Sequence, residues 1–208
     1  MAFSPAKENI LKKIRQALSN PVPLPFPHSE GAQSVFITPT EDPTVIFAEE
    51  FTRLQGKFAY CNDEANLHEQ LLQLFKERGW TKIWFKEQKI RAILEPGIRA
   101  FDDLAGCDVS LTGCEYLVAR TGTIVLSAAQ EKGRTGSVYA PVHICVAYTA
   151  QMAFDIKDAL QSVKDKYNNN IPSLITFASG PSRTADIEKT LVTGVHGPKE
   201  VYCFLVEG

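Results

Sequence analysis

Phe177-Ala-Ser-Gly-Pro-Ser-Arg-Thr-Ala-Asp-Ile-Glu188 is the stretch of this sequence that says most about its fold. An apolar run that starts at Leu174 leads into it, and the turn-forming pair Gly180-Pro181 interrupts it. Ile187 and Leu191 then follow at helical spacing. This order of signals predicts a strand, a tight turn and a helix. Such a unit directs backbone N–H groups at an anion, so the stretch is also a candidate binding site.

The alternation of strand and helix signals extends outward from this unit over most of the chain. Apolar, β-branched runs predict strands at 57–60, 83–85, 109–112, 116–119, 123–127, 144–148, 174–178 and 201–206. Helical spacing predicts helices at 43–54, between Asn62 and Gly79, and at 90–94, 152–163 and 184–192. The alternation favours an α/β fold of three layers, with a largely parallel sheet covered on both faces.

The first forty residues differ in composition from the rest. Ser4-Pro5 begins a helix with one apolar face, and Asn20-Pro-Val-Pro-Leu-Pro-Phe-Pro27 must follow as extended chain. We therefore predict an N-terminal helix and proline-rich arm over 1–40, and one domain over 41–208.

Composition narrows the function classes. The chain has 208 residues, 44% of them hydrophobic and 22% charged, with a formal net charge of −2. That balance predicts no general attraction to nucleic acid. No apolar run approaches the roughly 20 residues of a membrane span, and charged residues interrupt any leader at the N-terminus. We expect a cytoplasmic protein.

The five cysteines are Cys61, Cys107, Cys114, Cys145 and Cys203. No C-x-x-C spacing occurs, so we expect no zinc, no iron–sulfur cluster and no other cofactor held by this chain. Cys145 and Cys203 lie in apolar runs and are expected to be buried. A structural role is also the favoured interpretation of Cys107 and Cys114.

Three polar junctions follow predicted strands: Thr112-Gly-Cys-Glu115, Arg120-Thr-Gly-Thr123 and Ser179 to Glu188. Ligands of open α/β sheets bind outside the carboxyl ends of strands. Two plainer interpretations remain open, namely a hairpin turn at 120–123 and a capped helix at the third junction. The candidate binding residues are Thr112, Gly113, Thr121, Gly122, Thr123, Ser179, Gly180, Ser182, Arg183, Thr184, Asp186, Glu188 and Gly197.

The candidate catalytic residues are Glu115 and His196. His196 lies between two glycines in Gly194-Val-His-Gly-Pro198, and His143 begins a predicted strand. Either imidazole suits acid or base chemistry near neutral pH. A triad of Ser182, His196 and Asp186 is disfavoured because no G-x-S-x-G elbow is present. We expect the three junctions and the loop 194–197 to meet in one cleft.

Several motifs, in this order, carry a resemblance to a known family: Leu111-Thr-Gly-Cys-Glu-Tyr116, Arg120-Thr-Gly-Thr-Ile-Val-Leu126, Pro141-Val-His-Ile144, Ser179-Gly-Pro-Ser-Arg-Thr-Ala-Asp-Ile-Glu188 and Gly194-Val-His-Gly-Pro198. They resemble the lactate utilization protein C family, which is of YkgG type and carries a LUD domain. The resemblance covers roughly residues 45 to 208. It implies a fold similar to the NagB/RpiA/CoA-transferase-like group.

The resemblance also implies a subunit of a three-protein system that oxidises L-lactate to pyruvate, with two iron–sulfur proteins as partners. Two other function classes stay open. One is a free-standing enzyme of the CoA-transferase, isomerase or folate cyclo-ligase type, with Glu115 as nucleophile or base. The other is a non-catalytic assembly subunit. A small anionic ligand and a homo-oligomer fit each class, and fold alone does not choose between them.

Overall fold

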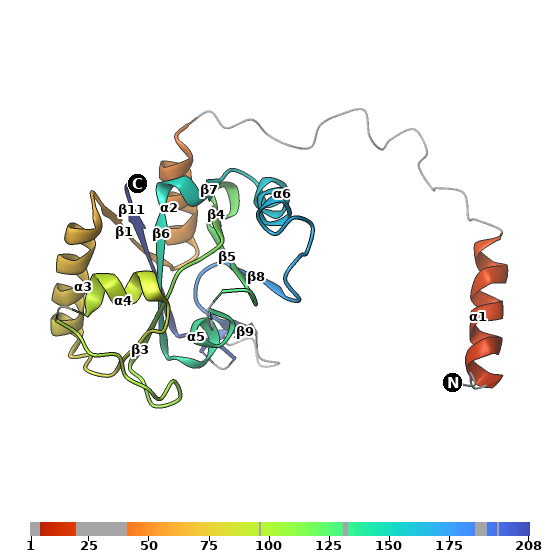
Figure 1. Cartoon of the computed structure of the whole chain (residues 1–208), viewed down its shortest axis with the longest axis horizontal. Helices are drawn as coiled ribbons and strands as arrows, with labels where there is room; N and C mark the ends of the chain where they lie inside the picture. The colour runs from red at the N-terminus through yellow and green to blue at the C-terminus, as the bar shows by residue number, and fades with distance from the viewer. Residues whose placement is uncertain (1–4, 20–40, 96, 131–132, 186–190, 195) are drawn as a thin grey trace. The chain divides into compact units, whose positions relative to one another are not determined.

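The structure, a computed structural model, describes residues 5–19, 41–95, 97–130, 133–185, 191–194 and 196–208. The chain divides into two units, Met1–Thr38 and Pro39–Gly208. In the first unit the described element is helix α1 (Pro5–Leu18), coloured red in Figure 1. The second unit contains all the remaining described elements. None of the described helices is both long and apolar enough to span a bilayer.

The second unit is built on a five-stranded, wholly parallel sheet. Its strands are β1 (Lys57–Cys61), β2 (Ile83–Trp84), β3 (Val109–Thr112), β6 (Val142–Tyr148) and β11 (Glu200–Val206). The order across the sheet is β1-β11-β6-β3-β2, and every neighbouring pair is parallel. The predicted α/β class with a largely parallel sheet is confirmed.

Two helices cover one face of this sheet, α3 (Glu64–Arg78) and α4 (Gln88–Leu94) (Figure 1). The cap of α3 is Asp63, one residue after the predicted Asn62, because its carboxylate accepts the backbone N–H of Asn66 at 2.7 Å. Gly79 ends the helix as predicted, with a left-handed φ of 67°. The core on this face includes Leu67, Leu71, Phe75, Ile90, Leu94, Leu111, Ile144 and Phe204.

Helix α2 (Pro43–Arg53) and a second sheet cover the other face. The second sheet has the order β7-β4-β5-β8, where β4 is Tyr116–Val118, β5 is Thr123–Ser127, β7 is Met152–Ala153 and β8 is Ile175–Ala178. The β4–β5 and β5–β8 pairs are antiparallel. The shared core includes Phe47, Phe51, Leu117, Ile124, Leu126, Cys145, Cys203 and Leu205.

Helix α6 (Ile156–Lys166) packs outside the second sheet, where Ala159 meets Val118 and Val125. It begins later than the predicted residue 152 because Asp155 is its cap and because Met152–Ala153 pairs with β4 as a strand. Three short elements complete the unit: the 3₁₀ turns η1 (Ala119–Thr121) and η2 (Thr149–Gln151), and helix α5 (Gly133–Tyr139).

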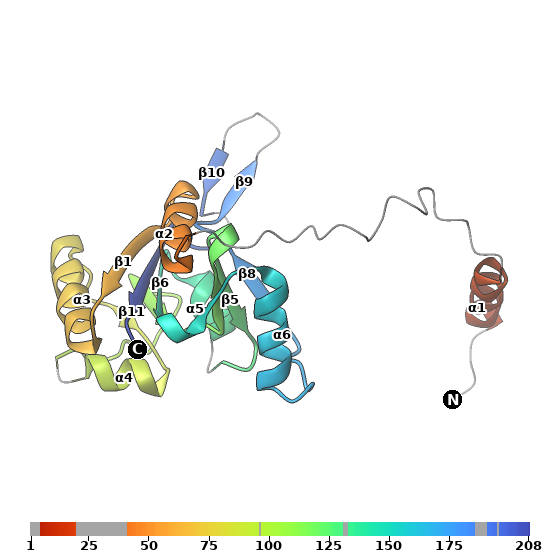
Figure 2. The same cartoon turned by 90° about the horizontal axis from the view of Figure 1, so that it is seen from above.

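The helix predicted at 184–192 is wrong at the residues of that range that the structure describes, 184–185 and 191–192, and residues 186–190 lie outside the described ranges. β9 (Arg183–Ala185) and β10 (Leu191–Thr193) instead form an antiparallel pair, which projects beyond α2 in Figure 2. The Ser182 N–H, which would have begun the helix, donates to the Pro198 carbonyl at 3.0 Å. β-branched residues at 184, 192 and 193 favour extended backbone, and two apolar positions were too few to define a helical face.

Candidate functional site

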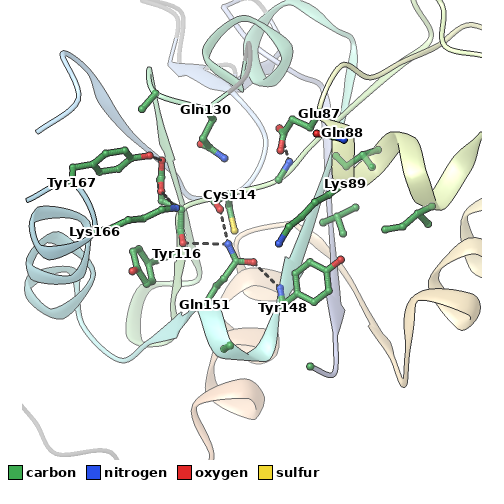
Figure 3. Close-up of a pocket in the computed structure, with 18 residues that line it drawn as sticks. Glu87, Gln88, Lys89, Cys114, Tyr116, Gln130, Tyr148, Gln151, Lys166 and Tyr167 are labelled. Carbon is green, nitrogen blue, oxygen red and sulfur yellow. Dashed lines mark hydrogen bonds and ion pairs between the residues drawn. The ribbon is translucent and has the colours of Figure 1, made fainter.

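A cavity of about 720 Å³ opens at the carboxyl edge of the central sheet (Figure 3). The segments that follow β2 and β3 line it, at 87–90 and 113–116, together with the end of β6 and the turn after it. Lys166 and Tyr167, from the end of α6, form the opposite wall. This is the place where open parallel sheets bind ligands.

Glu115 is the buried charge of this cavity. Glu115 is only 1% exposed, and both of its carboxylate oxygens have hydrogen-bond or ion-pair partners. Oε1 accepts hydrogen bonds from the Ser127 hydroxyl at 2.5 Å and the Tyr167 hydroxyl at 2.8 Å. Oε2 lies 2.7 Å from the Lys166 ammonium. A buried carboxylate needs such donors because water no longer solvates it.

These contacts fix the charge state of the group. Burial acts to raise the pKa of Glu115, but the hydrogen bonds from Lys166, Ser127 and Tyr167 outweigh burial and leave that pKa below its usual value. Burial acts to lower the pKa of Lys166, and the bond to Glu115 outweighs it, so the Lys166 pKa is raised. The pair therefore stands at neutral pH as a carboxylate and an ammonium.

The loop that carries Glu115 is held from both sides. The Gly113 N–H donates to Glu87 Oε1 at 2.8 Å, and a Cβ at Gly113 would lie 2.8 Å from Glu87 Oε2, so a larger residue would require the Glu87 carboxylate to shift. Gln151 Nε2 donates to the Cys114 carbonyl at 2.6 Å, while Gln151 Oε1 accepts the Tyr148 N–H at 2.9 Å. The loop is thus tied to the segments after β2 and β6.

Thr112 lies beneath the cavity in the sheet, not on its wall. Its hydroxyl is 2.8 Å from Nε2 of His143, and both residues are buried. Burial lowers the pKa of His143 to about 4, so the imidazole is neutral at neutral pH. His143 therefore acts in the core as a hydrogen-bonding partner.

The junction at 120–123 lies at the opposite end of the second sheet. β4 leads from Glu115 away to η1, and β5 returns from Thr123 to Ser127 beside Glu115. The Thr123 hydroxyl is 2.8 Å from that of Thr121 and 2.7 Å from that of Ser179. Two predicted junctions therefore do meet, and the hairpin interpretation of 120–123 holds, but they meet away from Glu115.

Packing against the end of α2 accounts for three more predicted residues. A Cβ at Gly122 would lie 2.5 Å from the backbone nitrogen of Phe51, and one at Gly180 would lie 2.5 Å from the carbonyl oxygen of Leu54. The Arg183 guanidinium donates to the same carbonyl of Leu54. Gly122, Gly180 and Arg183 therefore have a structural role, because each contacts the backbone at the end of α2.

Gly194 and Gly197 lie against Ser182, in the same region as Gly180 and Arg183 and away from Glu115. A Cβ at Gly197 would lie 2.9 Å from Cβ of Ser182, and the Gly194 N–H donates to the Ser182 carbonyl. His196 is exposed and is not among the residues that line the Glu115 cavity. Thr184 lies in β9, and Asp186 and Glu188 lie outside the described residues.

The expectation of one common cleft is therefore wrong for the described part of the chain. Of the predicted residues, Gly113 and Glu115 line the cavity, and none of those described at 121–123, 179–184 or 196–197 does. Sequence reasoning missed Lys89, Gln130, Gln151, Lys166 and Tyr167. None of these side chains stands in a motif, and Lys166 is 51 residues from the carboxylate that it binds.

All five cysteine thiols are buried. Burial raises the pKa of both Cys61 and Cys107 to about 11, so neither is a reactive thiolate. Within the ranges that the structure describes, no cluster of three or more His, Cys, Asp or Glu side chains is arranged to hold a metal ion.

This chain is similar in sequence to a known protein family and to several named proteins. A model of the LUD domain family matches residues 46–206. A protein of Shouchella clausii named lactate utilization protein C is 30% identical over 145 residues, covering 69% of this chain and 59% of that protein. An uncharacterized protein of Neisseria meningitidis serogroup B is 38% identical over 94 residues, covering 45% of this chain and 40% of its own length.

The chain spans about half the length of the curated relatives that it matches. One solved structure is similar in fold, the crystal structure of a DUF162 family protein from Deinococcus radiodurans. It has a TM-score of 0.59 and 18% identity, and the match covers 79% of this chain and 96% of that one. At this identity the likeness concerns the fold alone.

Proposed function

Because the chain belongs to the LUD domain family, we propose that it takes part in lactate utilization, as a subunit of a system that oxidises L-lactate to pyruvate with two iron–sulfur partner proteins. Relatives named lactate utilization protein C support this proposal. The single structural observation that carries it furthest is the cavity beside Glu115. A cavity at the edge where parallel sheets bind their ligands supports a role of this subunit in ligand binding.

Oxidation of L-lactate to pyruvate removes two electrons and two protons, and these electrons need an acceptor. The iron–sulfur clusters of the partners accept these electrons. The five cysteines of this chain are scattered, without cluster spacing, and all are buried. The part of this chain in the reaction is to bind and orient a small anionic molecule in the cavity.

The Glu115–Lys166 pair fits a role in orientation. The carboxylate has its two oxygens engaged by three donors, so it does not accept a proton readily. The ammonium of Lys166 is held at the cavity wall in one position by that carboxylate. This wall of the cavity is therefore fixed in advance, and a ligand that docks on it causes no reorganisation of the pair.

Reconstitution tests the proposed function. The two iron–sulfur partner proteins are purified and assayed for L-lactate oxidation with and without this chain. The chain is expected to raise the rate or the assembly of the complex, and Glu115→Gln is expected to reduce that gain. Full activity of the partners alone would refute the proposal.

A free-standing enzyme is the second candidate function, favoured by one observation. A buried charged carboxylate faces a cavity large enough for a substrate. In this alternative Glu115 would act on the substrate directly. The discriminating measurement is turnover by the isolated chain, and robust turnover without partners would favour the enzyme over the subunit.

A further inference from the structure

The size of the Glu115 cavity is the first clue to its ligand. At about 30 Å³ for each water-sized group, the six heavy atoms of L-lactate occupy at most about 180 Å³. The cavity measures about 720 Å³, so lactate fills no more than about a quarter of it. Cavities of roughly 300–1,000 Å³ are typical of sites for molecules of cofactor size. The volume therefore indicates a ligand several times larger than lactate.

The hydrogen-bonding groups left over in the cavity are the second clue. Several acceptor oxygens of the cavity are already engaged: Glu115 accepts three hydrogen bonds, Glu87 Oε1 accepts the Gly113 N–H at 2.8 Å, and Gln151 Oε1 accepts one. Gln130 Oε1 accepts the Ser127 N–H at 2.8 Å, which leaves the Gln130 amide N–H groups to point into the open space in Figure 3. The donors that remain suit an anionic group.

Lys89 supplies a positive charge to the same space. Its side chain points into the cavity in Figure 3, with the ammonium 5.5 Å from the centroid of the Tyr148 ring. In the part of the chain that the structure describes, no carboxylate lies within ion-pair distance of this ammonium. Lys166, by contrast, is neutralised by Glu115. Lys89 is therefore the cation available to a ligand.

The apolar wall is the third clue. Ile90, Ile93 and Val146 line the cavity on the side of the Tyr148 ring, and Tyr116 lies on the other side, next to Lys166 in Figure 3. The Tyr148 ring is held in place by its hydroxyl, which donates to Glu64 Oε1 at 2.6 Å. Flat apolar groups pack well on such a surface of aliphatic and aromatic side chains.

We propose that this cavity binds a ring-bearing anion of cofactor size, with the ring system on the Ile93 and Tyr148 wall and the anionic group held by Lys89 and Gln130. The inference rests on the proposed function only in taking the Glu115 cavity as the ligand site. It extends that function by giving the site a second ligand class, distinct from lactate.

The experiment uses matched probes on the full-length chain. Flavin mononucleotide and AMP carry both a ring and a phosphate. Riboflavin and adenosine carry the ring alone, while inorganic phosphate and L-lactate carry the charge alone. Fluorescence titration for the flavins and calorimetry for the others give each dissociation constant. We expect at least one ring-bearing phosphate to bind more than tenfold more tightly than its uncharged partner and than inorganic phosphate.

Variants test the assigned contacts. Lys89→Ala removes a charge-assisted hydrogen bond and is expected to weaken binding of that probe about tenfold or more. Ile93→Glu is expected to weaken it by placing a like charge on the apolar wall. Lys86→Ala is the matched control, because Lys86 lies three residues away, pairs with the exposed Asp102 and does not line the cavity.

The inference is overturned if no probe binds, if phosphate or L-lactate binds as tightly as the ring-bearing anions, or if Lys89→Ala and Lys86→Ala give the same affinity. These outcomes are independent of the proposed function. A chain that supports L-lactate oxidation with its partners yet binds no ring-bearing anion refutes this inference alone. A chain that binds such an anion but adds nothing to the partners refutes the proposed function alone.

Discussion

The Lys166 ammonium lies 2.7 Å from Oε2 of Glu115, although the two residues are 51 positions apart in the chain. This ion pair joins the last turn of α6 to the loop after β3. Glu115 is buried, while the Lys166 side chain is 50% exposed at the cavity wall. The pair thus connects the core of the fold with the surface that a ligand would meet.

Glu115→Gln is expected to lower the free energy of unfolding by about 1–3 kcal/mol, because it removes the charge that three donors surround. Exposure of Lys166 to solvent favours the lower part of that range. Urea unfolding measures the change. Glu95→Gln is the matched control, since Glu95 pairs with Arg91 on an exposed helical turn and its loss should cost no more than about 0.5 kcal/mol. Equal losses in the two variants would contradict the prediction.

The same carboxylate predicts a dependence of stability on pH. The pKa of Glu115 is lowered in the fold, so the unfolded chain binds the proton more readily. The stability that ionised Glu115 contributes is complete above its ordinary pKa of 4.5 and is lost as the pH falls through the lower folded value. The difference in unfolding free energy between the wild type and Glu115→Gln should narrow below about pH 4.5. A constant difference from pH 7 to pH 3 would show that Glu115 does not titrate in this way.

His143 predicts a second pH effect in a higher range. Its pKa falls from 6.5 to about 4 on burial, so protonation favours the unfolded chain between these values. At about 1.4 kcal/mol per pH unit, stability should fall by about 3 kcal/mol from pH 6.5 to pH 4. His143→Gln keeps a hydrogen-bonding partner for Thr112 and should flatten this slope. An unchanged slope in the variant would assign the effect to other groups.

Gly122→Ala is expected to lower the unfolding free energy by about 2–4 kcal/mol. The new Cβ would lie 2.5 Å from the Phe51 backbone nitrogen, at a residue whose φ is +53°. Gly79→Ala isolates the cost of the left-handed backbone, because its φ is +67° and no atom lies within 4 Å of the added Cβ. That control should lose only about 1 kcal/mol in the same urea experiment. Equal losses of unfolding free energy in the two variants would show that the close contact with the Phe51 backbone does not destabilise Gly122→Ala.

Arg183→Ala distinguishes the Glu115 cavity from the residues that pack against the end of α2. Because Arg183 bonds to the Leu54 carbonyl and does not line the cavity, the variant should bind the ring-bearing probe with unchanged affinity. It should lose less than about 1 kcal/mol of stability, since its side chain is exposed. Calorimetry and urea unfolding measure the two quantities. A tenfold loss of affinity would place Arg183 in the ligand site after all.

Local signals explain what the sequence predicted well. The strands predicted at 109–112 and 123–127 have the bounds observed for β3 and β5, because β-branched residues concentrate there. Proline at the start of α2 and Gly79 at the end of α3 set helix ends through their own backbone preferences. The position of Glu115 at the edge of a parallel sheet follows from the same reasoning.

Long-range contacts explain what the sequence did not reveal. Lys166 and Tyr167 meet Glu115 only because α6 packs across the second sheet, and no local pattern marks either residue. The pairing of β4 with β5 reverses the chain, so Arg120 and Glu115 end at opposite ends of one strand pair. Residues Ser179 to Arg183 were expected at the same edge as Glu115, and the antiparallel pairing of β8 with β5 places them at the other.

The position of β11 between β1 and β6 has a consequence for synthesis of the chain. β1 is made from residues 57–61 and β6 from residues 142–148, yet neither touches the other in the sheet, because residues 200–206 lie between them. On the ribosome, β1 and β6 each keep an unpaired edge until residues 200–206 leave the exit tunnel. Such edges are prone to pair with other chains. The edges of β1 and β6 are therefore open to such pairing in the period between translation of β6 and translation of β11.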